Sequence, residues 1–298
     1  MLIALTGATG FVGRRTLDLA LDAGHQVRAL ARRPQEARAG VTWVSGALED
    51  ARAVDALVSG ADAVAHIAGV VNAPDRAGFA AGNIDGTHAV VDAAERTDLR
   101  RFVHVSSLAA REPELSLYGW SKAEAERVVA KSDLDWTIVR PPAVYGPGDL
   151  EQIDVFRLAK LGLALLPPPG RMSAIMVDDL AALLVVLAER GGLRTVYEAD
   201  DGRAISHADY ARAIGRAVGR RVLPLPLPAP LLRFGARLDR LARGPRAKLT
   251  PDRAAYMAHP DWAADPIKRP PPELWTPQIT LGVGLAETVR WYKAQGLL

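Results

Sequence analysis

Short apolar runs alternate with amphipathic segments of helical spacing through the first half of the chain. The apolar runs predict strands near residues 2–6, 26–31, 41–45, 62–67, 101–106 and 135–140, with helices between them. Runs such as Val27-Arg-Ala-Leu-Ala31 and Phe102-Val-His-Val105 are typical of central strands in a parallel sheet that helices cover on both faces. The pattern therefore predicts an α/β fold built on a doubly wound parallel sheet.

The alternation stops after Pro141-Pro142. Clusters of proline and glycine follow at 146–148, 167–170, 224–230 and 270–272. We therefore expect a sheet domain over residues 1–145 and a smaller lobe over 146–298 that is partly interleaved with the sheet.

An amphipathic helix is predicted in the lobe over 230–243. Leu231, Phe234, Leu238 and Leu241 share one face, and Gly244-Pro245 is expected to end the helix. Arginines at 233, 237 and 240 lie beside that face. Three interpretations stay open: packing into the core, which is the commonest use of such a face, peripheral contact with a membrane surface, or a lid over an apolar substrate.

The composition is that of a globular protein. The chain has 298 residues, is 49% hydrophobic, carries a formal charge of +3 and contains no cysteine, which excludes disulfides and thiolate chemistry and favours a cytoplasmic location. No apolar run is long enough for a signal peptide or a membrane span. The basic stretch over 216–253 lacks aromatic residues other than Phe234, so no nucleic-acid partner is expected.

Three glycines spaced three apart follow the first predicted strand, in Thr6-Gly-Ala-Thr-Gly-Phe-Val-Gly13. Gly7 and Gly10 allow the backbone to turn sharply and approach a pyrophosphate, and Gly13 allows the next helix to pack closely against the strand. The amino-terminal end of that helix then faces the anion. A Walker-type loop is excluded, because no Gly-Lys-Ser/Thr follows. Residues 1–145 are therefore predicted to form a Rossmann-like dinucleotide-binding domain.

Three residues downstream suggest proton-transfer chemistry. Ser107 lies at the end of a predicted strand, and Tyr118-Gly-Trp-Ser-Lys122 follows on the next predicted helix, where residues four apart share one face. The Lys122 ammonium is expected to lower the pKa of Tyr118 from about 10, which makes the phenol a proton donor and acceptor near neutral pH. Ser107 can hydrogen-bond the substrate oxygen. We predict Ser107, Tyr118 and Lys122 as the catalytic residues.

Together these motifs resemble those of the extended short-chain dehydrogenase/reductases, a group that includes the NAD-dependent epimerase/dehydratases, dihydroflavonol reductases and 3β-hydroxysteroid dehydrogenases. The resemblance covers most of the chain. Further matching segments are Asn83-Ile-Asp-Gly-Thr87, Val105-Ser-Ser107, Arg140-Pro-Pro-Ala-Val-Tyr-Gly-Pro-Gly148 and Val177-Asp-Asp-Leu180. The resemblance implies hydride transfer at a carbinol carbon, with Tyr118 as acid and base and a carboxyl-terminal lobe that shapes the substrate site.

A nicotinamide cofactor is also implied by the resemblance. The positions implied to contact it are Gly7, Thr9, Gly10, Phe11, Val12, Gly13, Leu48, Ala68, Tyr118, Lys122, Pro141 and Val144.

The end of the second predicted strand indicates which dinucleotide binds. An Asp or Glu there would bind the ribose 2′-hydroxyl of NAD, and Gln26-Val-Arg-Ala-Leu-Ala-Arg-Arg33 contains neither. Arg32 and Arg33 suit a 2′-phosphate, because guanidinium groups pair with phosphate through charge-assisted hydrogen bonds. NADP is therefore expected rather than NAD. Ala47 stands where the family usually has an aspartate that contacts adenine, and Leu48 remains as a contact there.

Departures from the family pattern restrict the substrate. Leu108-Ala-Ala follows Ser107 where the dehydratases carry an acidic pair, so dehydration would lack its base. Met172 replaces the arginine that binds diphosphate in nucleotide-sugar enzymes, with Arg171 one position off. The segment between Tyr145 and Val177 is also shorter than in those enzymes. Leucines and prolines at 163–169 and 223–232 favour a more apolar small molecule.

The leading hypothesis is an NADP-dependent oxidoreductase that reduces a carbonyl or oxidises a secondary alcohol. An epimerase with a permanently bound cofactor and a non-catalytic structural or regulatory protein that binds NADP(H) remain as alternatives. A homodimer through the helices near 78–97 and 118–131 is also open.

Three further polar residues lie within these segments. Asn83 either positions the cofactor site or satisfies backbone groups. His66 and His104 lie in apolar runs and are expected to be hydrogen-bonded interior residues rather than ligands, and no histidine pair has the spacing of a metal site.

Overall fold

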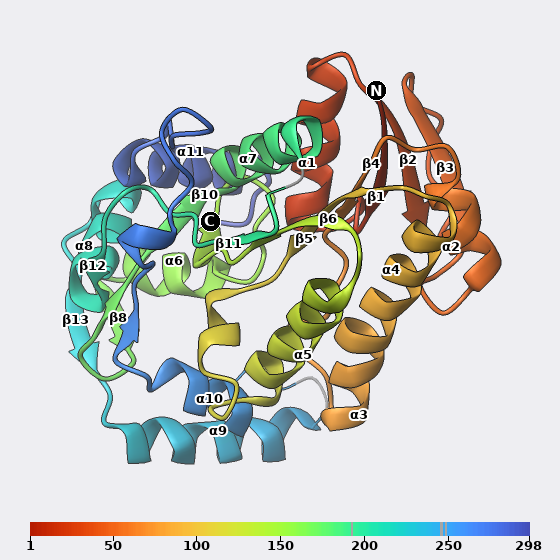
Figure 1. Cartoon of the computed structure of the whole chain (residues 1–298). Helices are drawn as coiled ribbons and strands as arrows, with labels where there is room; N and C mark the ends of the chain where they lie inside the picture. Colours follow the sequence, from red (N-terminus) through yellow and green to blue (C-terminus); the bar gives the residue numbers. More distant parts are fainter. Residues whose placement is uncertain (192, 245–246, 248) are drawn as a thin grey trace.

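Seven parallel strands form the main sheet, in the order β11-β6-β5-β4-β1-β2-β3 (Figure 1). The computed structural model describes residues 1–191, 193–244, 247 and 249–298. The strands of this sheet are β1 (Leu2–Thr6), β2 (Gln26–Ala31), β3 (Val41–Ser45), β4 (Ala63–His66), β5 (Arg101–Val105), β6 (Asp135–Val139) and β11 (Thr195–Tyr197). All six strands expected from the apolar runs are present, and the predicted α/β doubly wound sheet is confirmed.

Helices cover both faces of this sheet, as the near-continuous apolar strands require. They are α1 (Phe11–Asp22) and α7 (Val177–Arg190) on one face, and α2 (Ala51–Val58), α4 (Gly86–Arg96) and α5 (Leu117–Lys131) on the other (Figure 1). Successive strand residues point to opposite faces, so Ile3 and Leu5 pack in the core cluster with α1 and α7. Ala4 packs in the other cluster, with α2, α4 and α5.

The strand order reverses between β1 and β4. The chain runs outward from β1 to β2 and β3, then crosses back to β4 on the other side of β1. In open sheets of this kind a ligand binds outside the carboxyl ends of the strands at the point of reversal. Gly7 and Ala68 follow these two strands, so the fold places the glycine turn at that point.

The remaining elements build the second half of the molecule around three small sheets. These pair β7 (Ala143–Tyr145) with β10 (Ala174–Met176), β8 (Leu163–Leu166) with β13 (Leu223–Pro226), and β9 (Arg171–Met172) with both β12 (Ile205–Ser206) and β14 (Asp261–Trp262). The other helices and helical turns are α3 (Arg76–Phe79), η1 (Ala80–Asp85), η2 (Leu108–Arg111), α6 (Ile153–Lys160), α8 (His207–Val218), α9 (Ala229–Arg243), α10 (Pro251–Met257), η4 (Pro266–Lys268) and α11 (Leu281–Ala294).

The second half interleaves with the sheet layer. Strand β11 extends the main sheet beyond β6, and α7 packs beside α1. The division at residue 145 stays a prediction. Helix α9 matches the helix expected over 230–243, with Gly244 at its end; Pro245 lies outside the described residues. None of the helices over the described residues has the length and apolar character that crossing a bilayer requires.

Candidate active site

The glycine turn between β1 and α1 is shaped by close backbone contacts. Gly7 has φ of 75°, and the Gly10 amide donates to its carbonyl oxygen at 2.9 Å. A Cβ atom on Gly13 would lie 2.0 Å from the Gly7 carbonyl oxygen, inside any allowed contact. The first turn of α1 can therefore approach the end of β1 only if position 13 is glycine.

Thr6 joins the ends of β1 and β4. Its hydroxyl oxygen accepts hydrogen bonds from the Ile67 and Ala68 amides, each at 3.1 Å, and the hydroxyl lies 2.8 Å from Nδ1 of His66. A Cβ atom on Gly7 would lie 2.7 Å from the Ala68 nitrogen. The two predicted cofactor positions Gly7 and Ala68 are thus in direct contact.

His66 continues this network away from the turn. The Thr87 hydroxyl donates to the Asn83 carbonyl oxygen at 2.6 Å, so Nε2 of His66, 3.1 Å away, donates to Thr87 and Nδ1 accepts from Thr6. Burial, together with the positive charge of Lys122, lowers the pKa of His66 to about 3. The ring is therefore neutral, as this arrangement of donors and acceptors requires, and His66 is the hydrogen-bonded interior residue that its sequence predicts.

His104 is the exception among the expected interior histidines. Its ring stacks on that of His66 with centroids 5.4 Å apart, and it is buried. Neither ring nitrogen has a hydrogen-bond partner in the described part of the chain. The expectation that His104 is a satisfied residue is therefore wrong.

Asn83 lies in the π-helical turn η1 and is buried. Its Oδ1 accepts from the Val70 amide at 2.8 Å, while its Nδ2 donates to the Val70 carbonyl at 3.0 Å and to the Ser121 hydroxyl at 2.8 Å. A Cβ on Gly69 would lie 2.8 Å from Asn83 Oδ1 and 3.7 Å from Lys122 Nζ. Asn83 therefore satisfies backbone groups of the loop after β4 and stands beside the Tyr-Lys helix at the same time.

Tyr118 and Ser107 begin neighbouring elements at the carboxyl edge of the sheet. Ser107 precedes η2, where its hydroxyl accepts from the Ala109 amide at 3.2 Å, and Ser116 starts α5 by accepting from the Gly119 amide at 2.9 Å. Burial raises the pKa of Tyr118, and a hydrogen bond with the Ser107 side chain opposes that rise. The phenol is therefore protonated at neutral pH. The expectation that this pKa is lowered is wrong, because the effect of burial is larger than that of the opposing hydrogen bond from Ser107.

Lys122 is only 5% exposed and lies one turn after Tyr118 on α5. Its Nζ donates to the Val105 carbonyl oxygen at the end of β5, at 2.8 Å. Burial lowers the pKa of Lys122 to about 8, although the charge of Glu126 opposes the shift. The lysine is thus held at the end of the central strand and titrates close to physiological pH.

A buried ionic network joins Glu126, in the second half of α5, to the ends of the neighbouring strands. Glu126 accepts hydrogen bonds from Ser106 at 2.5 Å and, in a bidentate pair, from Arg140 at 2.8 and 2.5 Å. Arg140 also lies 3.6 Å from Glu198, which is fully buried and paired with Arg111 at 3.2 Å. These charged groups connect the residues that follow β5, β6 and β11. The end of β5, which Ser107 follows, is therefore held in a defined position.

Two aromatic rings flank Tyr118. The Phe79 ring lies 6.3 Å from the Tyr118 ring between centroids, and Tyr256 of α10 meets it edge-on at 6.5 Å. Asp252, also on α10, accepts from the Leu117 amide at 2.5 Å, which fixes α10 over the start of α5. Sequence reasoning missed both rings. Thr250-Pro-Asp at the start of α10 is a helix-start signal, but nothing in it predicts which element the helix contacts.

The positions predicted for the adenosine end lie on neighbouring loops. Arg32 and Arg33 follow β2 directly and are exposed, and neither guanidinium has a hydrogen bond or ion pair with another described residue. Leu48, in the loop after β3, is partly buried against Gly86. Asp50 caps α2 by accepting from the Arg52 and Ala53 amides.

The other predicted cofactor positions are spread around the turn. Thr9 is exposed, Phe11 contacts the loop at Gly148, and Val12 and Val144 pack against the sheet. The Pro141 carbonyl oxygen accepts from the Leu108 amide at 3.1 Å, next to Ser107. The structure therefore brings Ser107, Tyr118 and Lys122 together at one edge, whereas Val144 lies on β7 and packs in the core cluster with α1 and α7.

The segments expected to shape an apolar substrate site lie elsewhere. Leu163 and Leu223 are paired on β8 and β13, and their side chains are exposed to solvent. Arg171 is paired with Asp261 at 3.0 Å, and Met172 packs in a core cluster. Neither residue takes the place of a diphosphate-binding arginine.

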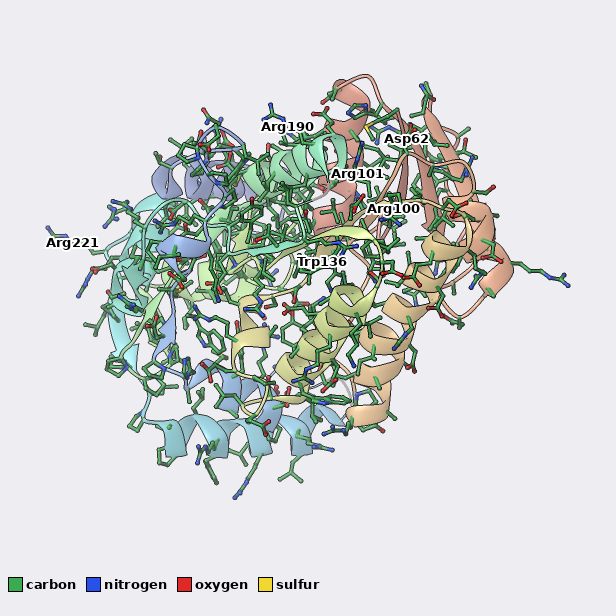
Figure 2. The ribbon with its side chains drawn as sticks, viewed as in Figure 1. Asp62, Arg100, Arg101, Trp136, Arg190 and Arg221 are labelled. Carbon is green, nitrogen blue, oxygen red and sulfur yellow. The ribbon has the colours of Figure 1, made fainter. Side chains whose placement is uncertain are left out.

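Two hollows in the structure do not coincide with this site. One, of about 360 Å³, lies at the amino ends of the strands, where Asp62, Arg100, Arg101 and Arg190 gather (Figure 2). The other, of about 380 Å³, is lined by the prolines of β13 and by His207. The carboxyl edge with Tyr118 is opposite the first hollow, because the strands are parallel.

Similarity to known proteins agrees with this geometry. A family model described as NAD(P)H-binding matches residues 7–189, and a ceramide reductase of Caulobacter vibrioides is 37% identical over 99% of this chain and 96% of its own length. The chain belongs to the extended short-chain dehydrogenase/reductase family. The resemblance stated from the motifs is confirmed, and the protein is an NAD(P)-dependent enzyme of that family.

More distant relatives have the same family character. A 3β-hydroxysteroid dehydrogenase/Δ5→4-isomerase of Mycobacterium tuberculosis is 25% identical over 78% of this chain and 73% of its own length. The crystal structure of the Bordetella bronchiseptica enzyme WbmH in complex with NAD+ covers 99% of each chain at 20% identity, with a TM-score of 0.74. The second similarity concerns the fold alone.

Proposed function

We propose that this family member is an NADPH-dependent carbonyl reductase, or in reverse a secondary-alcohol dehydrogenase, acting on a fairly apolar small molecule. The observation that carries the proposal is the grouping of Ser107, Tyr118 and Lys122 at the same sheet edge as the glycine turn. NADPH, when bound with its pyrophosphate at the turn, supplies the hydride.

The side chains have separate roles in this reaction. Tyr118 is protonated at neutral pH and donates its proton to the carbonyl oxygen as the carbon is reduced. Ser107 hydrogen-bonds the same oxygen and holds it towards Tyr118. Lys122, whose pKa is near 8, keeps a positive charge beside the phenol below that pH and stabilises the phenolate left after proton donation.

The apolar character of the substrate is inferred from the surroundings of Tyr118. The rings of Phe79 and Tyr256 flank the phenol, and Leu108, Ala109 and Ala110 are buried where an acidic pair would be needed for dehydration. The relative named a ceramide reductase acts, by its name, on a lipid. A ketone or aldehyde on a long-chain or ring-containing molecule fits these features better than a nucleotide sugar.

Replacing the phenol tests the proposal. Tyr118→Phe removes the proton donor and keeps the ring, so turnover of ketones with NADPH should fall by about 10²- to 10⁴-fold while NADPH still binds. Tyr292→Phe is the matched control, because the Tyr292 hydroxyl is buried without a partner among the described residues. Near wild-type turnover in Tyr118→Phe, measured by NADPH absorbance on a substrate found by screening carbonyl compounds, would show that the assignment is wrong.

We also propose the cytoplasm as the location, because a reducing compartment suits a chain without cysteine.

We propose NADP as the cofactor. Arg32 and Arg33, which follow β2 and have no ion pair with another described residue, support a 2′-phosphate site. Arg32→Ser/Arg33→Ser should weaken NADPH binding roughly tenfold or more and leave NADH binding unchanged, because only the phosphate contacts are lost. Fluorescence titration measures both affinities, with Arg52→Ser, an exposed arginine on α2, as the control. An equal loss for both nucleotides would assign the arginines another role.

A further inference from the structure

Helix α9 has an apolar face that points out of the molecule. Leu231, Phe234, Leu238 and Leu241 are spaced three or four residues apart, so they share one face, and they are 52%, 56%, 50% and 82% exposed. The helix runs along the lower edge of the molecule, where its side chains extend away from the rest of the protein (Figures 1 and 2). A continuous row of four large apolar side chains in solvent is unusual for a protein surface.

The opposite face of α9 attaches the helix to the protein. Leu232 and Ala236 are 5% and 0% exposed and pack with Ala254 of α10, with Leu249 and Met257 beside them. Because this cluster buries one face of α9 against the protein, the apolar row on the other face points outward. Core packing, the commonest interpretation of such a row, is therefore wrong for the four residues named above.

A row of positive charge runs beside the apolar row. Arg233, Arg237 and Arg240 are exposed, and none of them has an ion pair with another residue in the described part of the chain. Arg243, at the end of the helix, is paired with Asp239 at 3.2 Å. An apolar face flanked by unpaired arginines matches an anionic interface, in which the apolar side chains enter the acyl boundary and the guanidinium groups bind phosphates.

We propose that α9 docks the protein onto the surface of an anionic lipid bilayer. The apolar row supplies the buried area, and the arginines select membranes that carry negatively charged headgroups. A second copy of this chain fits the face less well, because pairing two α9 helices through their apolar rows would bring two unpaired arginine rows close together.

Docking would place the candidate active site near the lipid. Helix α10 lies between α9 and α5: Ala254 packs against α9, Asp252 binds the start of α5, and the Tyr256 ring meets Tyr118. If the proposed function holds, a carbonyl compound dissolved in the bilayer reaches Tyr118 from the docked side. This last step rests on the proposed reductase activity, whereas docking itself does not.

Vesicle co-sedimentation tests the docking without any activity assay. The whole protein should sediment with vesicles of phosphatidylcholine and phosphatidylglycerol and bind vesicles of phosphatidylcholine alone roughly tenfold or more weakly. Phe234→Asp/Leu241→Asp should lose roughly tenfold or more of the binding to the anionic vesicles. Val283→Asp is the matched control, because Val283 is 53% exposed on α11 at the opposite side of the molecule from α9 (Figure 1). Circular dichroism on heating verifies that each variant is folded.

Charge variants separate the arginines from the apolar row. Arg233→Glu/Arg237→Glu/Arg240→Glu should abolish the preference for anionic vesicles. Arg52→Glu/Arg203→Glu/Arg290→Glu changes the net charge equally at three exposed positions away from α9 and should reduce the preference far less. The proposal is overturned if the wild-type protein does not sediment with anionic vesicles, or if the α9 variants bind as well as their controls. It is equally overturned if Phe234→Asp/Leu241→Asp instead converts a dimer seen by gel filtration into a monomer with vesicle binding unchanged.

Discussion

Tyr118 and Lys122 show how one buried environment shifts an acid and a base in opposite directions. Burial disfavours the charged form of each group, so it raises the pKa of the phenol and lowers that of the ammonium to about 8. Burial therefore favours the neutral form of both groups, which lie one helical turn apart on α5. A protonated phenol is the form that can donate to a carbonyl oxygen, which suits the reductive direction of the proposed reaction.

Lys122 should make the stability of the protein depend on pH in a specific window. Its pKa is about 8 in the folded chain and 10.5 as the ordinary value, so the unfolded chain binds more protons between these pH values. The free energy of unfolding therefore rises with pH from about 8 to 10.5. Below pH 8 the folded protein bears the full cost of burying the charged Lys122 ammonium. The contribution is roughly 3 kcal/mol at 1.36 kcal/mol per unit.

Lys122→Met removes this penalty, since methionine is similar in length and uncharged. At pH 7 the variant should have a higher free energy of unfolding than the wild type. The gain is reduced by about 1 kcal/mol, because the hydrogen bond to the Val105 carbonyl oxygen is lost. The gain should vanish as the pH approaches 10. Urea unfolding at a series of pH values measures the difference. Lys131→Met, an exposed lysine on the same helix, is the control and should follow the wild type. A difference that is constant with pH would contradict the role assigned to burial.

At the scale of elements, the β1–turn–α1 unit depends on backbone approach rather than on side chains. Gly13 faces the Gly7 carbonyl oxygen so closely that no side chain fits. Gly13→Ala should therefore lower the free energy of unfolding by about 3 kcal/mol and abolish dinucleotide binding, because α1 must move away from the end of β1. Thermal unfolding with and without NADPH measures both effects.

Gly282→Ala is the matched control for the glycine substitution. Gly282 lies in the first turn of α11, and a Cβ atom there would meet nothing within 4 Å. Alanine should leave cofactor binding unchanged and stabilise the helix by up to about 1 kcal/mol. Equal losses in the two variants would mean that helix propensity, and not the close contact at Gly7, explains the result.

Local spacing explains which features the sequence could predict. The strands follow from apolar runs, the glycine turn from three glycines spaced three apart, and the shared helix of Tyr118 and Lys122 from their four-residue spacing. All three features are present in the structure. The direction of the apolar row on α9 could not be predicted, because Leu232 and Ala236 compete with it for the protein side of the helix. The contact of Tyr256 with Tyr118 is likewise set by tertiary packing.

On the scale of the whole molecule, Arg111 joins the region after β5 to a segment near the carboxyl terminus. It ends η2, which Ser107 caps, and donates to Glu198 at 3.2 Å and to the carbonyl oxygens of Ala263 and Asp261 at 2.8 and 3.0 Å. The segment it holds includes Trp262, whose ring packs 4.6 Å from that of Tyr256. Arg111 therefore helps to fix the ring that faces Tyr118.

Arg111→Met should lower the free energy of unfolding by about 3 kcal/mol, because Glu198 is left buried with its charge less well compensated. It should also raise KM for the carbonyl substrate more than it changes the affinity for NADPH. The segment that carries Trp262 and supports Tyr256 is less firmly held, whereas the glycine turn makes no contact with Arg111 in the hydrogen bonds described above. Arg171→Met is the control: Arg171 binds the side chain of Asp261 in the same segment but is 63% exposed, so its loss should cost less than about 1 kcal/mol. Urea unfolding and steady-state kinetics on both variants measure these effects. If both substitutions lower the free energy of unfolding equally, the role assigned to Arg111 is wrong, because the exposed Arg171 pair would then stabilise the segment as much as the Arg111 pair.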